Sequence, residues 1–462
     1  MALKAAVGKA SQGDRMKRSF EKTLRIALLL IGLVLASVVF YQVWVVYYNP
    51  YIRLPFYRRG NYMITLMYMA ILTICVLVMK GQGIGRSRLA EVIISQCIAL
   101  TMTAVVVYFP MSLLQYELLR PLPLLIMLPG QWLLVFIWNY LANFIYVKLV
   151  PPLKLLLVCD RDDGWRVADK LNKYPKGYSV NLSANVSEGK AVIWERLHAC
   201  DGVLLDVHDD VWRSWVIRQC FKKDKLLFLV PTLTDVIVNC TKELHQIDTP
   251  LLCSREHRHT IEERAVKRAM DVVLSALALL LVSPLLLAIA LAIKLDDGGP
   301  VLFRQERLTR DGKLFCILKF RSMVPDAERD GQRLAEEHDA RVTRVGHMLR
   351  KTRLDELPQL FNVLWGDMSL VGPRPECPSI AARYEKQLPE FAYRLKVKAG
   401  ITGYAQVYGD YATDPADKLM MDIMYIEQHD IVVDLNIMLL TIRALFMTDK
   451  TRGRKEQVEA KA

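Results

Sequence analysis

The chain has 462 residues, of which 53% are hydrophobic and 24% charged, and its formal net charge is +13. At ~150 residues per domain, this length predicts about three structural units. Nine cysteines without a Cys-x-x-Cys pair exclude a disulfide framework, and eight histidines without a His-Glu-x-x-His spacing disfavour a zinc hydrolase. A basic chain favours an anionic partner, but no zinc-finger, RNA-binding or basic-zipper pattern points to nucleic acid.

Four apolar segments fill the first third of the chain, and each is close to the ~20 residues that a helix needs to cross a bilayer. They are Leu24–Val46, Tyr62–Val78, Ala90–Leu114 and Leu122–Val147. Four core helices of a soluble protein are the alternative, but such helices are shorter and apolar on one side only. Lysine and arginine are dense in the N-terminal tail, in the second loop and after the fourth segment, which places both the N-terminus and residue 150 onward in the cytoplasm. The arginines at 53, 58 and 59, in the first loop, point the other way.

Residues 151–253 predict a small α/β module, because short apolar runs alternate with helical patterns, as in a parallel sheet. The runs are Leu153–Cys159, Gly202–Val207 and Leu226–Val230. No Gly-x-Gly-x-x-Gly follows the first run, so the sequence does not indicate a nucleotide site there. We expect a structural or dimerising module.

The fifth apolar run, Val272–Ile293, is interrupted by Ser283 and Pro284. Proline removes a backbone hydrogen bond and clashes with the preceding turn, so we expect a kink. Two arrangements remain open: an ordinary kinked span, or a re-entrant helix that breaks at Ser283-Pro284 and keeps both ends in the cytoplasm. In a re-entrant helix, the Ser283 hydroxyl can bond a carbonyl that the proline leaves free.

Two apolar runs, Pro300–Arg307 and Leu314–Met323, flank Arg310-Asp311-Gly312, which predicts a β-hairpin. The hairpin is basic, with Arg304, Arg307, Lys313, Lys319 and Arg321. A solvated basic face is the simplest explanation of such a charge run. Its place directly after a membrane helix favours contact with phosphates, Lys319 and Arg321 included.

The adjacent carboxylates Asp355 and Glu356 follow Arg350 and precede Pro358. Because proline is tolerated only in the first turn of a helix, we expect a helix to start near Asp355. Asp355 is then either the N-cap, or part of a capping box with Thr352. The alternative is phosphoryl transfer, in which one ionised carboxylate attacks phosphorus and the other holds Mg²⁺ against a diphosphate.

Arg374 lies between two prolines, in Val371-Gly372-Pro373-Arg374-Pro375-Glu376. A rigidly presented arginine suits bidentate binding of phosphate. The alternative is a turn with an exposed arginine.

Residues from about 264 to 447 resemble the monotopic phosphoglycosyl transferase superfamily, the bacterial sugar transferases that start exopolysaccharide, capsule or O-antigen repeat units. The matching pieces are ordered along the chain. They are Lys267-Arg268-x-x-Asp271, Ser283-Pro284, Gly299-Pro300-Val301-x-Phe303-x-Gln305-x-Arg307, Lys319-Phe320-Arg321-Ser322-Met323, Leu354-Asp355-Glu356-Leu357-Pro358-Gln359, Gly366-Asp367-Met368-Ser369, Val371–Pro375 and Gly400-Ile401-Thr402-Gly403. By layout, the N-terminal segments and the central module resemble the large multi-domain members, the polyprenyl-phosphate hexose-1-phosphate transferases.

This resemblance implies an enzyme that transfers hexose-1-phosphate, glucose or galactose, from a UDP-sugar to undecaprenyl phosphate and releases UMP. It implies a covalent aspartyl-phosphosugar intermediate, Mg²⁺ as cofactor, and contact with membrane lipids. It also implies a homodimer in the bacterial inner (cytoplasmic) membrane, with its active site on the cytoplasmic face, that catalyses the first membrane step of surface polysaccharide synthesis. A non-catalytic scaffold of a polysaccharide assembly machine is the alternative, and it predicts that Asp355 is dispensable. A transporter is disfavoured, because the spans are nearly devoid of charge.

The resemblance also assigns roles to residues. Asp355 is the expected nucleophile, Glu356 its Mg²⁺-associated partner, and Arg350 and Arg374 the expected phosphate contacts. The further candidates are Glu376, Arg394, Asp422 and Tyr425, the last two as an Asp-x-x-Tyr pair. Three positions depart from the family pattern: Thr309, where glycine is usual, Ala399, where proline is usual, and Asp410, where arginine is frequent.

The expected architecture therefore has three parts. Residues 1–150 form an N-terminal bundle of four transmembrane helices, and residues 151–253 form a cytoplasmic Rossmann-like module. Residues 254–462 form an α/β catalytic domain with a re-entrant membrane helix at about 268–294. Helical patterns at Lys418–Glu427 and Leu435–Phe446 suit the membrane interface, or packing against the catalytic helix.

Overall fold

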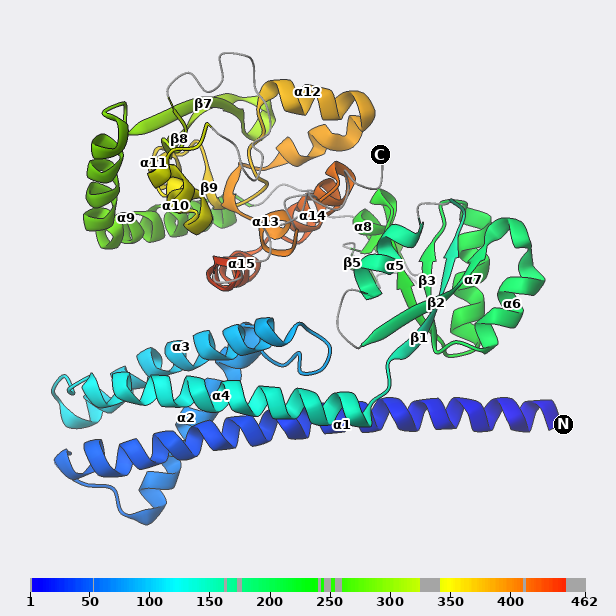
Figure 1. The fold of residues 1–462 in the computed structure, drawn as a ribbon, viewed down its shortest axis with the longest axis horizontal. Coiled ribbons are helices and arrows are strands. Elements are labelled where there is room, and N and C mark those ends of the chain that lie inside the picture. Colours follow the sequence, from blue (N-terminus) through cyan, green and yellow to red (C-terminus); the bar gives the residue numbers. More distant parts are fainter. Residues whose placement is uncertain are drawn as a thin grey trace. The chain divides into compact units, whose positions relative to one another are not determined.

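The chain divides into two compact units, Met1–Val230 and Pro231–Ala462 (Figure 1). The structure is a computed structural model. It describes all residues except 1, 53, 162–163, 173–176, 240–241, 245–250, 254–259, 325–340, 410–412 and 446–462. Asp410, one of the three departures from the family pattern, therefore lies outside the described residues.

The first unit begins with long apolar helices. They are α1 (Ala2–Val43), α2 (Arg58–Val78), α3 (Leu89–Gln115) and α4 (Leu122–Leu149), and a π-helical turn, Trp44–Tyr48, extends α1. Figure 1 shows them packed lengthwise against one another. Together with α9 of the second unit, they make five helices in the described chain that are long and apolar enough to cross a membrane. The four predicted spans are confirmed as helices.

Polar side chains inside this bundle are paired with one another. Gln131 donates to the Tyr68 hydroxyl and to the carbonyl of Ala36, and Asn139 donates to Gln96. Unpaired polar groups cost several kcal/mol in an apolar medium, so such pairs tie specific helices together.

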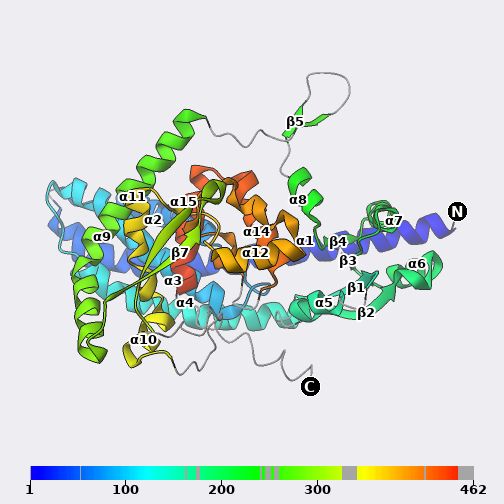
Figure 2. The same cartoon turned by 90° about the horizontal axis from the view of Figure 1, so that it is seen from above.

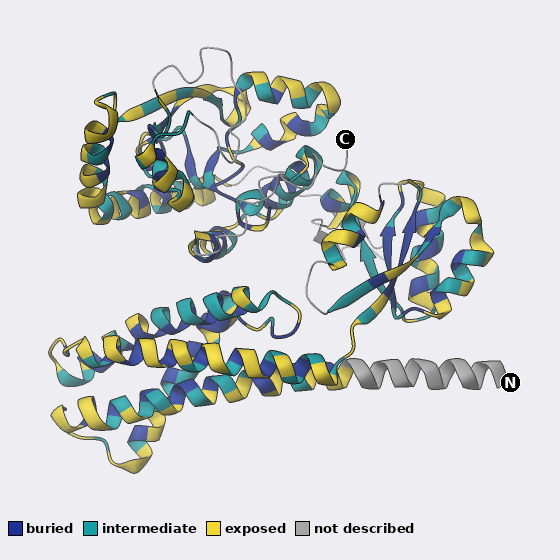
Figure 3. Ribbon diagram, in the orientation of Figure 1, coloured by how far each residue is buried: buried dark blue, intermediate teal, exposed yellow. Residues whose placement is uncertain are grey.

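The rest of this unit is a parallel sheet in the order β2-β1-β3-β4. Its elements are β1 (Leu153–Cys159), α5 (Trp165–Asn172), β2 (Tyr178–Asn185), α6 (Lys190–His198), β3 (Gly202–Asp206), α7 (Asp210–Lys222) and β4 (Leu226–Leu229). Successive residues of β1 enter separate apolar clusters, which explains its continuous apolar run (Figure 3). The three predicted strands are confirmed. Strand β2 is not predicted from the sequence, because polar and apolar residues alternate along this edge strand and leave no continuous apolar run. Only Val180 and Ala184 of β2 are buried.

The second unit starts with α8 (Leu233–Asn239) and the hairpin β5 (Lys242–Leu244) and β6 (Leu251–Cys253). The sequence-based division assigns α8 to the central module. In the structure, Val236 of α8 belongs to the same apolar cluster as Ile423 and Ile437 of the C-terminal helices.

Helix α9 (Ile261–Asp297) is one continuous helix that contains Pro284. Figures 1 and 2 show that it changes direction partway along its length, and an internal proline is a recognised cause of such a bend. The Ser283 hydroxyl donates to the carbonyl of Leu280, at 2.9 Å. Leu280 is the residue whose carbonyl would bond residue 284 in a regular helix, so the serine occupies the acceptor that the proline leaves free. The predicted kink and its hydrogen bond are confirmed.

The remaining elements surround a small mixed α/β region. They are β7 (Leu302–Leu308), β8 (Leu314–Phe320), α10 (Arg344–Thr352), α11 (Gln359–Trp365), β9 (Ser369–Val371), α12 (Pro378–Gln387), the 3₁₀ segment Pro389–Lys396, β10 (Gly400–Thr402), α13 (Tyr404–Tyr408), α14 (Pro415–Gln428) and α15 (Ile431–Leu445). Strands β7 and β8 pair antiparallel, and Asp311 and Gly312 between them have φ of 59° and 71°. This left-handed turn confirms the predicted hairpin.

Candidate active site

The two adjacent carboxylates lie in a turn between helices. Helix α10 ends at Thr352, and its C-cap residue, Arg353, adopts the left-handed conformation with φ of 56°. A 3₁₀ turn, Leu354–Glu356, follows, and α11 begins at Gln359 with Pro358 as its N-cap residue. A helical turn thus starts near Asp355 as expected, but it is a 3₁₀ turn of three residues, and the α-helix itself begins only at Gln359.

The capping interpretation of Asp355 is wrong for the same reason. No side chain caps α11, and the hydroxyl of Thr352 donates backward to the carbonyl of Met348. The carboxylates are thus presented by the turn and do not serve the backbone of the helix that follows.

Glu356 is held by two cations from distant parts of the sequence. Its Oε1 accepts from Lys319 Nζ of β8 at 3.0 Å and from Arg374 Nη2 at 2.7 Å. Burial alone would raise the pKa of Glu356, but Arg374 and Lys319 outweigh it and lower that pKa well below its usual range. In turn, Glu356 raises the pKa of Arg374. At neutral pH, Glu356 is therefore an ionised anchor for both cations.

Asp355 is in a different situation. Within the described part of the chain, its side chain has no hydrogen bond or ion pair with another residue. Burial and the neighbouring Glu356 raise the pKa of Asp355, while the positive charges of Lys319, Arg350 and Arg374 oppose that shift. Two carboxylates whose environments push their pKa values apart are typical of a pair with separate roles. Asp355 is the member that remains available to a substrate.

The segment that carries Arg374 is anchored at successive carbonyls. The carbonyls of Pro373 and Glu376 accept from the amides of Gly400 and Leu308, at 2.8 and 3.1 Å. The carbonyls of Arg374 and Pro375 accept from the side chains of Arg394 and Arg307, at 2.9 and 3.2 Å.

This anchoring needs a close approach of two backbones. A Cβ on Gly372 would lie 2.4 Å from the carbonyl oxygen of Lys398, and a Cβ on Gly400 would lie 2.1 Å from the amide nitrogen of Gly372. Only glycine fits at contacts this short. The sequence motifs Val371–Pro375 and Gly400-Ile401-Thr402-Gly403 therefore pack against each other through their glycines.

A second layer of charges lies behind Arg374. Arg394 forms an ion pair with Asp422 of α14, at 2.8 Å between Nη2 and Oδ2, and lies 3.6 Å from Glu376. Burial raises the pKa of Asp422 to about 6, against the opposing effect of Arg394. These candidate residues come together, and Arg374 links them to the carboxylate pair through its ion pair with Glu356.

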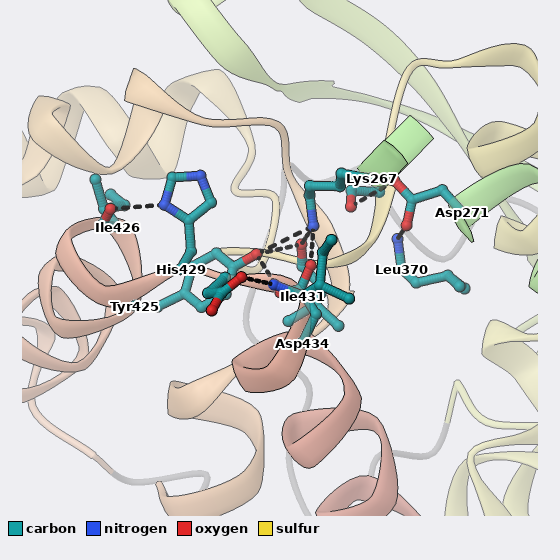
Figure 4. Close-up of polar contacts among 11 residues, drawn as sticks. Lys267, Asp271, Leu370, Tyr425, Ile426, His429, Ile431 and Asp434 are labelled. Carbon is teal, nitrogen blue, oxygen red and sulfur yellow. Dashed lines mark hydrogen bonds and ion pairs between the residues drawn. The ribbon is translucent and has the colours of Figure 1, made fainter. Parts of the chain in front are cut away.

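The motif Lys267-Arg268-x-x-Asp271 fastens the start of α9 to this region (Figure 4). Lys267 forms an ion pair with Asp434 of α15, and Asp271 accepts from Ser369 and from the amide of Leu370. Arg268 donates to the carbonyls of Val363 and Leu364, at the end of α11. Lys267 donates to the hydroxyl of Tyr425, which shares its one proton between Asp434 and the carbonyl of Val371.

Several candidates lie away from the carboxylates. Arg321 is buried against α9, where it pairs with Asp297 and donates to the carbonyl of Pro300. Tyr425 is almost fully buried in the network around Lys267. Among the described residues, Arg321 therefore has no hydrogen bond or ion pair with Asp355 or Glu356, and Tyr425 supports β9.

Two of the departures from the family pattern contact each other. The Thr309 hydroxyl accepts from the amide of Ala399 at 3.2 Å and donates to the carbonyl of Asp367 at 2.9 Å. A proline at 399 would have no amide to offer, and a glycine at 309 would have no hydroxyl. In the sequence, Thr309 and Ala399 are two separate departures from the family pattern, whereas the structure makes them partners.

Sequence reasoning missed the roles of Arg307 and Asp434. In the sequence, Arg307 is one of several hairpin cations, and Asp434 lies just before the helical pattern Leu435–Phe446, with no motif around it. Their partners are 68 and 167 residues away in the chain, so no local spacing could have revealed them.

No cluster of three or more His, Cys, Asp or Glu side chains suited to a metal occurs among the described residues. The Asp355-Glu356 pair nevertheless fits Mg²⁺ in one respect. Mg²⁺ usually takes one or two carboxylates and completes its shell with water and substrate phosphate, and Asp355 has an unengaged carboxylate.

Comparison with known proteins places this region in a family. The bacterial sugar transferase family matches residues 262–448. The chain is 45% identical over 183 residues to UDP-N-acetylgalactosamine-undecaprenyl-phosphate N-acetylgalactosaminephosphotransferase of Aeromonas hydrophila, which covers 39% of this chain and 43% of that protein. It is 46% identical over 184 residues to UDP-glucose:undecaprenyl-phosphate glucose-1-phosphate transferase of Escherichia coli (strain K12), which covers 39% of this chain and 40% of that protein.

A shorter relative is matched over nearly its whole length. The exopolysaccharide production protein PSS of Rhizobium leguminosarum bv. phaseoli is 40% identical over 200 residues, which are 41% of this chain and 97% of that protein. By contrast, the match spans only about two fifths of the first two relatives. Because the motif-bearing region is shared across such relatives, this chain belongs to the bacterial sugar transferase family.

Proposed function

We propose that this protein transfers a sugar-1-phosphate from a UDP-sugar to undecaprenyl phosphate and releases UMP. The observation that carries the proposal is the carboxylate pair, in which Glu356 is neutralised by Lys319 and Arg374 while Asp355 stays unengaged. The relatives in Aeromonas hydrophila and Escherichia coli are named for such a transfer.

The reaction proceeds in two displacements at phosphorus. The Asp355 carboxylate attacks the phosphorus attached to the sugar, an Asp355 oxygen–phosphorus bond forms, and UMP leaves with the electrons of the broken phosphoanhydride bond. An oxygen of undecaprenyl phosphate then attacks the same phosphorus, and the Asp355 carboxylate leaves. A covalent relay lets a soluble donor and a lipid acceptor use one site in turn.

The cations serve the charge that develops on the phosphate oxygens. Arg374 is 46% exposed although it is paired with Glu356, so part of its guanidinium is free to meet a phosphate. Lys319 and Arg350 contribute positive charge from β8 and α10. Because their charges also favour ionised Asp355, the nucleophile and its substrate are stabilised by the same groups.

Asp355 and Glu356 are the residues that would hold Mg²⁺, as expected from their motif. When bound together with a diphosphate, the ion would neutralise charge on the phosphate oxygens and favour loss of UMP. The chain's own contribution is to keep Glu356 ionised and Asp355 unengaged.

We further propose that α9 is a re-entrant helix in the bacterial inner membrane, with both of its ends in the cytoplasm. The bend at Pro284 and the exposed leucines on both sides of it, Leu280, Leu281, Leu287 and Leu291, support this arrangement. The first four helices cross the membrane, α14 and α15 lie at its interface, and the protein acts as a homodimer. This arrangement keeps Asp355 on the side where UDP-sugars are made.

The sugar is glucose, galactose or N-acetylgalactosamine. Glucose and N-acetylgalactosamine are the sugars in the names of the relatives. Galactose is the further sugar that the resemblance to the family implies. All three can be compared in one assay.

The test is UMP release from the three UDP-sugars, with undecaprenyl phosphate and Mg²⁺, by wild type and by Asp355→Asn. We expect wild type to turn over at least one donor and Asp355→Asn to lose at least roughly a thousandfold of that rate, because the nucleophile is gone. Asp311→Asn is the matched control, since Asp311 is exposed at 64% on the hairpin and asparagine tolerates its left-handed conformation. Full activity of Asp355→Asn would contradict the mechanism. If no donor is turned over by wild type, the scaffold interpretation takes its place.

A further inference from the structure

One face of α14 serves the backbone on which Arg374 stands. Asp422 and Tyr425 are three residues apart on α14, and positions with this spacing lie on the same side of a helix. The Tyr425 hydroxyl lies 3.0 Å from the carbonyl of Val371 and 2.8 Å from Asp434 Oδ1, and it shares its one proton between these two acceptors. Asp422 pairs with Arg394, whose Nη2 donates to the carbonyl of Arg374. The Asp-x-x-Tyr pair thus supports both ends of the segment from Val371 to Arg374.

We infer that Arg394 and Asp422 are positioning residues, whose buried ion pair holds the backbone of Arg374 and so aims its guanidinium at Glu356 and at the substrate phosphate. The functional half of this inference rests on the proposed function. The structural half does not depend on which substrate is used.

Burial makes the Arg394–Asp422 ion pair rigid enough to hold the backbone of Arg374. Arg394 and Asp422 are 4% and 1% exposed, so neither charge is relaxed by water. The Arg394 guanidinium also lies 4.7 Å from the centre of the Phe391 ring, which is itself buried. A buried guanidinium that is fixed by a carboxylate and an aromatic ring has little freedom to follow a displaced carbonyl. The Arg374 backbone must therefore adapt to Arg394.

The geometry at Glu356 demands such control. Arg374 Nη2 lies 2.7 Å from Glu356 Oε1, and Nη1 lies 3.5 Å from Oε2, so the guanidinium meets the carboxylate with both of its ends. Two-point contacts of this kind tolerate little rotation. Residues that hold a reacting group through its neighbours are commonly needed to keep such contacts within about 0.5 Å.

A simpler role for the pair is the stability of the core alone. The two roles differ in one respect: a positioning residue acts through Arg374, so its loss should matter little once Arg374 is absent. A residue that only stabilises the fold would lower activity by the same factor whether Arg374 is present or not.

The experiment is a double-mutant cycle in the full-length protein, with UMP release as the readout, over Arg394→Ala, Arg374→Ala and the double variant. We expect Arg394→Ala to lower kcat by roughly tenfold to a hundredfold, with KM changed by less than about threefold. In the Arg374→Ala background, the same substitution should change kcat by less than about twofold. Equal losses in both backgrounds would overturn the inference.

Amide hydrogen exchange gives a readout that needs no substrate. The amides of Gly400 and Leu308 donate to the carbonyls of Pro373 and Glu376, on the two sides of Arg374. Both amides should exchange faster in Arg394→Ala and unchanged in Arg383→Ala, a control arginine exposed on α12. Unchanged exchange in Arg394→Ala would overturn the positioning role.

Asp422→Asn covers the case in which Arg394→Ala does not fold, because it keeps the volume and removes only the charge. It should change kcat and amide exchange in the same directions, by smaller factors. Wild type is assayed in the same series. If wild type releases no UMP, the proposed function fails while amide exchange still decides whether the pair positions Arg374.

Discussion

Asp355 and Glu356 are neighbours in sequence, yet their surroundings shift their pKa values in opposite directions. Lys319 and Arg374 hold Glu356 ionised, whereas burial and the adjacent negative charge disfavour ionised Asp355. The consequence extends to stability, because a shifted pKa changes the free energy of unfolding with pH. A carboxylate with a raised pKa weakens the folded state when ionised, and one with a lowered pKa strengthens it.

Substitution of each carboxylate should therefore change stability in opposite directions. At pH 7, Asp355→Asn should raise the midpoint of thermal unfolding, because it removes a carboxylate that is costly to ionise. Glu356→Gln should lower the free energy of unfolding by roughly 1–3 kcal/mol, since it leaves two cations without their partner, one of them partly solvated.

The pH dependence follows from the directions of the pKa shifts. The contribution of Glu356 is present above its unfolded pKa of about 4.3 and is lost as pH falls through its lowered folded pKa. The penalty from Asp355 develops as pH rises from its unfolded pKa of about 3.9, so the advantage of Asp355→Asn should shrink near pH 4. Thermal unfolding in detergent at both pH values measures this. A loss of stability in Asp355→Asn at pH 7 would mean that the protein has a partner for that carboxylate.

Helix α9 continues through an internal proline, Pro284. Pro284 lacks an amide, and the Ser283 hydroxyl serves the Leu280 carbonyl in its place. Leu280 is 74% exposed on an apolar helix, where a bare carbonyl would face lipid in the proposed arrangement. Near its N-terminal end, the same helix is fixed by the charged residues Lys267, Arg268 and Asp271.

The serine should matter only while the proline is present. Ser283→Ala should destabilise the otherwise wild-type protein by about 1 kcal/mol, because the Leu280 carbonyl then has no donor. In a Pro284→Ala background the cost should be small, since the amide of residue 284 bonds that carbonyl itself. Unfolding by SDS from mixed micelles, on the four members of this cycle, measures the coupling. Equal costs in both backgrounds would show that the hydroxyl has another role.

All the described side chains of the candidate site belong to the second of the two compact units of the molecule. The carboxylates, their cations and the supporting pairs all come from the unit Pro231–Ala462. The Rhizobium relative has little beyond the matched region, which covers 97% of its length. The N-terminal helices and the parallel sheet contribute no side chain to the site within the described residues of that unit.

A chain cut to residues 231–462 should therefore keep UMP release within roughly tenfold of the full-length protein, because a compact unit with its own core can fold alone. A cut at 254 should be less stable, since it removes α8 and with it Val236 from the C-terminal core. Specific activity and thermal unfolding of both pieces, in detergent, provide the comparison. Loss of Asp355-dependent activity in a folded 231–462 piece would assign the N-terminal unit a catalytic role.

Local patterns in the chain were enough to predict the long helices, the buried strands, the hairpin and the kink at Pro284. Each depends on residues close in sequence: apolar runs of membrane length, continuous apolar strands, an Asp-Gly turn and a missing amide. The edge strand β2 was not predicted because polar residues alternate with its apolar ones and leave no continuous apolar run. The start of α11 was misplaced because proline can cap a helix from just outside it as well as occupy its first turn.

The motifs also identified Asp355 and Glu356 as candidates, but not which of them is engaged. That difference depends on Lys319 and Arg374, which are 37 and 18 residues from Glu356 in the chain. Likewise, Lys267 pairs with Asp434, 167 residues away in the chain, and Arg394 donates to the carbonyl of Arg374, 20 residues away. Sequence spacing constrains only neighbours along a helix or strand, whereas charges in a folded site interact over a few ångströms of space. Their pairing, and with it the division of roles between two adjacent carboxylates, exists only once the chain has packed.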